Sequence, residues 1–66
     1  MADPVSWLLI ERGWEVVDAQ GERVGNVDEV LGDPEHDIWD GLTVDGEYVA
    51  AERVGEIVTG RITLAP

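Results

Sequence analysis

The acidic stretch from Asp33 to Asp40 is the one segment whose residue types suit a metal ion. Four carboxylates, Asp33, Glu35, Asp37 and Asp40, flank the chain's single histidine, His36. Carboxylate oxygens of this kind suit calcium or magnesium. The stretch lacks the sixth-position glycine and the distal glutamate of an EF-hand loop. It therefore predicts either a solvated acidic turn, which is the simpler interpretation, or a weak cation site.

Groups suited to catalysis are scarce. A nucleophile must lie beside a base that a third group orients, and the single serine, Ser6, has no sequence relationship to His36. The glycines of Gly55 to Ile62 imitate a phosphate-binding loop, but an arginine and an isoleucine replace its lysine and its Ser/Thr. We therefore predict no enzyme and no cofactor.

The charge of the chain excludes several classes of partner. There are 15 acidic residues and 4 basic ones, giving a formal net charge of -11. Such a charge repels phosphate backbones and anionic lipids, so we expect no binding to nucleic acid or to membranes. A basic partner protein would fit. The absence of cysteine excludes disulfides and thiolate metal sites, and we expect a cytoplasmic protein.

The N-terminal segment, residues 1–12, carries an unusual apolar run. Trp7, Leu8, Leu9 and Ile10 follow one another, and flanking proline and glycine signals predict a short helix or helical turn over residues 4–11. The run is too short to span a bilayer. A 66-residue chain has a thin core, so we expect this run to form the interface of a homo-oligomer, most simply a two-fold dimer. For Trp7, an intramolecular lid is an equal alternative.

The remainder, residues 13–66, reads as one all-β domain. Strands are predicted over residues 14–18, 23–31, 38–44, 47–51, 56–59 and 61–64, separated by turn residues. The 23–31 segment should be a long, bent strand, because Gly25 marks a bulge. Asp45-Gly46 predicts a type I′ hairpin turn, and residues 51–54 a helical or 3₁₀ turn. Five or six short strands favour a small barrel. Its predicted core is Val16, Val24, Val27, Leu42, Val44, Val49, Ile57, Ile62 and Leu64.

These segments together resemble a known family. Residues 13–33, GWEVVDAQGERVGNVDEVLGD, resemble the opening of PRC-barrel domains, with its "VGxVxxV" strand. IWDGLTV at 38–44 is similar to the family's central "DGL" strand, YVAAERV at 48–54 to its "VPAERV" segment, and residues 55–64 to its closing hairpin. Two departures stand out. Ala50 replaces the proline of "VPAERV", and the Asp45-Gly46 link is shorter than in many relatives.

The resemblance implies a five- or six-stranded PRC-type barrel that binds other proteins and has no catalytic role. The favoured interpretation is therefore a protein-docking, self-associating module. The alternative is a cation-responsive module that uses the 33–40 loop.

Overall fold

Strand β2 (Arg23–Asp33) organises the fold, because it pairs with β1 near its beginning and with β3 near its end. The computed structural model describes residues 5–66. The remaining strands of this part are β1 (Glu15–Val17), β3 (Ile38–Val44), β4 (Glu47–Ala50), β5 (Val54–Val58) and β6 (Arg61–Leu64). Single 3₁₀ turns, η1 (Trp7–Leu9), η2 (Pro34–His36) and η3 (Ala51–Arg53), connect or flank them.

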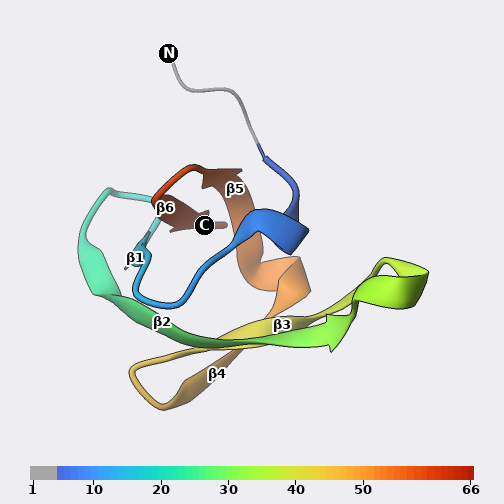
Figure 1. The fold of residues 1–66 in the computed structure, drawn as a ribbon. Helices are drawn as coiled ribbons and strands as arrows, with labels where there is room; N and C mark the ends of the chain where they lie inside the picture. Colours follow the sequence, from blue (N-terminus) through green and yellow to red (C-terminus); the bar gives the residue numbers. More distant parts are fainter. Residues whose placement is uncertain (1–4) are drawn as a thin grey trace.

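The six strands form one sheet in the order β4-β3-β2-β1-β6-β5. The β1–β6 pair is parallel and the other pairs are antiparallel. In this order β4 and β5 are the terminal strands, and the sheet between them is strongly curved (Figure 1). The predicted small all-β barrel of five or six strands is confirmed, in the form of a six-stranded curled half-barrel.

Bulges bend the two long strands. Val16 pairs with Gly25 and Val17 with Arg23, so Val24 is an extra residue in β2. The pairing with β3 leaves Asp28 extra in the same way, and further along it leaves Asp40 extra in β3. An extra residue bends the strand and reverses the side-chain alternation beyond it. The predicted long, bent strand is therefore confirmed.

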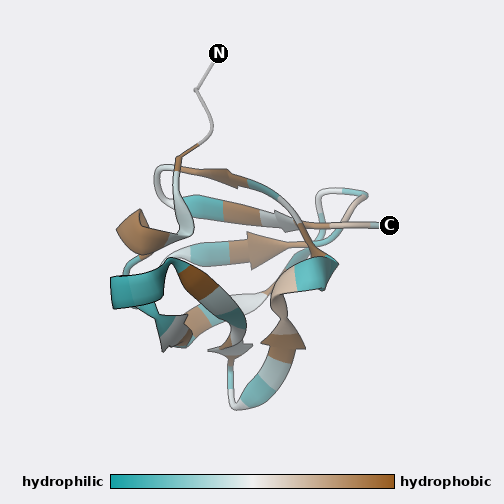
Figure 2. Cartoon of the chain, turned by 90° about the vertical axis from the view of Figure 1, so that its right-hand side faces the viewer, coloured by the Kyte–Doolittle hydropathy of each residue, from teal (hydrophilic) through white to brown (hydrophobic). Residues whose placement is uncertain are grey.

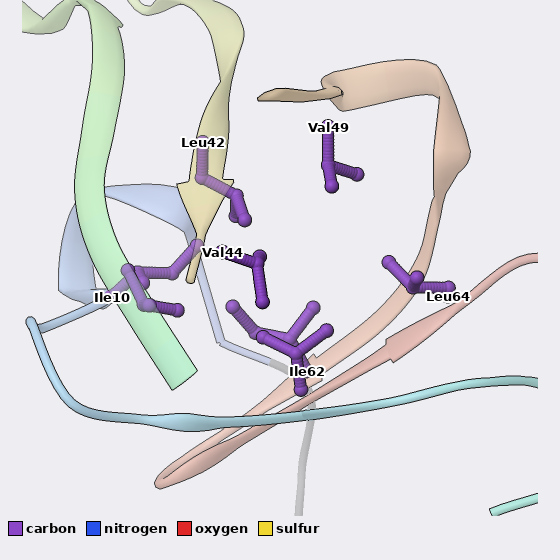
Figure 3. Packing of buried hydrophobic residues seen from close by; sticks show 8 residues of the cluster. Ile10, Leu42, Val44, Val49, Ile62 and Leu64 are labelled. Carbon is purple, nitrogen blue, oxygen red and sulfur yellow. The ribbon is translucent and has the colours of Figure 1, made fainter. Parts of the chain in front are cut away.

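The core lies inside the curl of the sheet. Figure 3 shows side chains from β3, β4 and β6 converging there together with Ile10. Of the predicted core, seven side chains are buried: Val16, Val27, Leu42, Val44, Val49, Ile62 and Leu64. Ile57 is partly buried against them. Val24 was predicted wrongly, because the bulge leaves it 46% exposed.

The β3–β4 hairpin is fastened to β2 at its tip. Asp45 and Gly46 have φ values of 48° and 86°, as the predicted type I′ turn requires. The Asp45 carboxylate accepts the backbone N–H of Asn26 at 3.2 Å, and the Asp28 carboxylate accepts the backbone N–H of Gly46 at 2.6 Å. These bonds fix where β4 lies relative to the rest of the sheet.

Candidate docking surface

The N-terminal segment forms one 3₁₀ turn, η1, which is followed by an extended residue, Ile10. The Ser6 hydroxyl accepts the backbone N–H of Leu8 at 3.2 Å and so caps η1. The turn ends at once, because Ile10 has extended backbone angles, φ -64° and ψ 132°. The expected helical turn within residues 4–11 is therefore limited to Trp7–Leu9, and residue 4 lies outside the described residues.

Trp7 packs against the chain's own sheet. Its indole stacks on that of Trp39, with ring centroids 5.9 Å apart and planes inclined by 5°. Its Nε1–H donates to the Asp37 carboxylate at 2.9 Å. A Cβ at Gly32 would lie 3.1 Å from the ring, so the glycine makes room for it. Trp7 thus closes over the end of β2 and β3, in the manner of the lid alternative.

Ile10 is not available as an interface residue. It is only 8% exposed and belongs to the core cluster. Its backbone N–H donates to the Trp7 carbonyl at 3.1 Å, so Ile10 forms the C-cap of η1 while its side chain lies in the core. The expectation that all four apolar residues form an interface is therefore corrected for Ile10.

Leu8 and Leu9 remain on the outside of the turn, 49% and 59% exposed. We call these two residues the η1 patch. Figure 2 shows η1 as an apolar, brown turn standing at the periphery of the sheet. From Val5 to Ile10 the chain carries no charged residue, so the patch lies on an uncharged segment of a strongly acidic protein.

Two carboxylates of the acidic loop, those of Asp33 and Asp37, accept hydrogen bonds within the protein. Asp33 caps η2 by accepting the backbone N–H of Glu35 at 3.1 Å, and its other oxygen lies 2.6 Å from Nδ1 of His36. Asp37, in the left-handed region at φ 52°, holds Trp7. Within residues 5–66 there is no group of three or more His, Cys, Asp or Glu side chains placed to hold a metal ion.

Ser6 and His36, the two residues weighed for nucleophilic chemistry, each have a local structural partner. Ser6 caps η1, and His36 lies against Asp33. No pocket is present in the part of the chain that the structure describes. None of its helices is long and apolar enough to cross a membrane.

A second exposed surface lies on the outer side of the β2–β3–β4 sheet. Paired residues share a face, and Leu42 and Val49 are paired and buried. Their neighbours Thr43 and Tyr48, also paired, therefore point outward, and Tyr48 is 52% exposed. The bulge at Asp40 brings Ile38 to the same outer face, where it is 60% exposed. We call Ile38 and Tyr48 the outer patch.

Sequence reasoning missed the outer patch. By simple alternation Ile38 would lie on the same face as the buried Leu42 and Val44, and Asp40 gives no sign in the sequence that a bulge reverses this alternation. For Tyr48 there was a signal, since Val49 was placed in the core and its neighbour in a strand must face the other way.

Tyr48 is held over the sheet by its own contacts. Its hydroxyl donates to the Asp40 carbonyl at 3.0 Å, and its ring lies over Gly41, where a Cβ would be 3.1 Å from the ring edge. Partial desolvation and the negative charges of Asp40 and Glu52 raise the pKa of Tyr48 above its ordinary value of 10.0. Two carboxylates therefore act on the outer patch.

Comparison with known families agrees with this fold. The model of the PRC-barrel domain matches residues 12–52 of the 66-residue chain. The chain belongs to the PRC-barrel domain family. Comparisons with curated proteins and with solved structures gave no match.

The matched part of this PRC-barrel domain runs from just before β1 through most of η3. It includes both Ile38 and Tyr48, while η1, β5 and β6 lie outside it. The family match names a barrel domain and indicates no catalytic family. The two exposed patches are therefore the features from which a function must be argued.

Proposed function

We propose that this PRC-barrel domain is a non-enzymatic protein-docking module that associates with a second copy of itself through the η1 patch. The observation that carries the proposal is the exposure of Leu8 and Leu9, 49% and 59%, on a turn that the Trp7–Trp39 stack holds in place. A large apolar side chain that moves from water to a full apolar contact contributes about 1.5–3 kcal/mol.

Two-fold symmetry makes this patch self-complementary, since each copy presents the same two leucines to the other. Because residues 5–10 carry no charge, the contact brings few carboxylates together directly. The more distant charges are screened within a Debye length of about 8 Å at physiological salt. The turn is already ordered by Ser6 and Trp7, so association loses little conformational entropy.

Light scattering after size exclusion tests self-association at tens of micromolar protein and physiological salt. We expect a concentration-dependent rise towards the mass of a dimer, since the patch is small. Leu8→Ser combined with Leu9→Ser should hold the protein at the monomer mass. Ile38→Ser, which removes an equally exposed side chain from another surface, is the matched control and should still dimerise. A monomer mass for the unaltered protein throughout this range would rule out the proposal.

A further inference from the structure

The two terminal strands of the sheet differ in how their outer edges are used. At β5, the Ile57 carbonyl accepts the backbone N–H of Val5 at 2.9 Å, so the N-terminal segment covers part of that edge. At β4, the pairing with β3 is the only strand pairing found within residues 5–66. Among the described residues, nothing pairs with the outer edge of β4, which can therefore accept another strand.

The hairpin geometry identifies the open backbone groups. In a two-residue hairpin, the residues that flank the turn exchange both of their hydrogen bonds; here these are Val44 and Glu47. The pairs alternate from that point, so Val49 also bonds to β3. The N–H groups of Tyr48 and Ala50 and the C=O of Tyr48 therefore point to the free edge, whereas the C=O of Ala50 begins η3 as its N-cap.

The charged residues of β3 and β4 are all acidic. β3 and β4 contain no basic residue, and Glu47 is an exposed residue of β4 itself. Glu29 shares the outer face through its pairing with Thr43, and Asp40 and Glu52 lie near Tyr48. An apolar outer patch is thus combined with an open strand edge and a surround of carboxylates.

We propose that the β4 edge and the outer patch bind an extended, basic segment of a partner protein, which adds to the sheet as a further strand. This inference rests on the docking role proposed above and names its partner class. Main-chain bonds to Tyr48 and Ala50 supply affinity, as in other cases of strand addition. Alternate side chains of the segment lie on Ile38 and Tyr48, and its Lys or Arg residues face the carboxylates.

A second copy of this chain does not fit the same edge. Each copy carries a net charge of -11, and pairing of β4 with β4 places the two Glu47 residues within the same short ladder. Like charges close to one another in a ladder are destabilising. The uncharged η1 patch is where a second copy fits, whereas the β4 edge requires a partner of opposite charge.

Ala50 provides a substitution that removes only the edge donor. Its backbone φ is -67°, the value at which a proline ring holds φ. Ala50→Pro therefore keeps the fold and the pairing of β4 with β3 while it deletes the outward N–H. Proline also stands at this place in the family's "VPAERV" pattern, from which this chain departs.

The test is selection of displayed random peptides, each of about twelve residues, on the immobilised protein. We expect enriched peptides in which Lys or Arg alternates with β-branched or aromatic residues. For the best of them, made synthetically, Ala50→Pro and Glu47→Lys should each weaken binding at least tenfold. Glu56→Lys, the same charge change on the opposite terminal strand β5, is the matched control and should retain affinity within about twofold.

Three results would overturn the inference: selection that enriches no peptide, enrichment without basic residues, or binding that Ala50→Pro and Glu47→Lys leave unchanged. The result is independent of self-association, because neither variant touches the η1 patch. A dimer that selects no basic peptide would reject this inference alone. A monomer that selects such peptides would reject only self-association.

Discussion

The indole of Trp7 lies flat on the indole of Trp39, with centroids 5.9 Å apart and planes only 5° from parallel. The two residues are 32 positions apart, and their contact closes the N-terminal segment over the end of the β2–β3 pair. The Trp7 ring is held at its polar edge by Asp37 and has room only because Gly32 lacks a side chain. The stack is therefore what places the η1 patch on the sheet.

Loss of the stack should destabilise the domain. Trp7→Ala removes a half-buried indole together with its aromatic partner, and we expect the free energy of unfolding to fall by about 1–3 kcal/mol. Urea denaturation followed by circular dichroism measures this change. Val24→Ala is the control, since this side chain is exposed, lies outside the η1 patch and should cost less than about 0.5 kcal/mol. Equal effects from the two variants would contradict the structural role of the stack.

Gly32 should tolerate no side chain. A Cβ there would lie 2.6 Å from the Ile38 carbonyl oxygen and 3.1 Å from the Trp7 ring, so Gly32→Ala must displace backbone or indole. We expect it to cost about 1–3 kcal/mol of stability. Gly55→Ala is the matched control within a strand, because its closest contact would be 3.3 Å. Thermal unfolding of both variants tests this, and a Gly32→Ala protein as stable as Gly55→Ala would contradict it.

The fold could be predicted well from turn residues and β-type patterning, because both act locally. Asp45-Gly46 requires positive φ at both positions, and the strands on either side follow from it. The exposed surfaces were harder to predict, because the positions of the bulges decide which side chains face outward. An extra residue at Val24 turned a predicted core side chain outward, and one at Asp40 brought Ile38 to the outer patch.

Ile10 illustrates the other limit of sequence reasoning. A run of four apolar residues predicted an interface, but a single 3₁₀ turn distributes them in three directions: Trp7 onto Trp39, Leu8 and Leu9 outward, and Ile10 into the core. The direction of each side chain depends on the contact between Trp7 and Trp39, which lie 32 residues apart in the sequence. No local sequence pattern encodes that contact. Predicting it requires the sheet to be assembled first.

Ala50→Pro should stabilise the protein. The residue already has φ -67°, and its N–H faces the free edge, so proline adds no strain and breaks no bond of the ladder. The unfolded chain loses conformational freedom, which contributes about 0.4–1 kcal/mol and raises the Tm by a few degrees. Differential scanning calorimetry measures the shift.

The control for this substitution is proline one residue earlier. Val49 is buried and bonds to β3 through its backbone, so Val49→Pro should cost about 3 kcal/mol or more. If Ala50→Pro destabilised the protein as strongly, the N–H of Ala50 would have to point into the sheet, and the strand-addition inference would lose its basis.

Tyr48 should titrate above its ordinary pKa of 10.0. Partial desolvation and the charges of Asp40 and Glu52 favour the neutral phenol in the folded protein. Tyr48 is the single tyrosine of the chain, so phenolate absorbance reports this residue alone. Because the folded state holds the proton more tightly than the unfolded state, stability is fully present below about pH 10 and falls as the pH rises above it. Asp40→Asn should lower the pKa of Tyr48, because it removes one negative charge and leaves in place the backbone carbonyl that accepts the hydroxyl, whereas Glu56→Gln on β5 should leave the pKa unchanged. A titration of the folded protein at or below pH 10, or one insensitive to Asp40→Asn, would show that these carboxylates do not act on the outer patch.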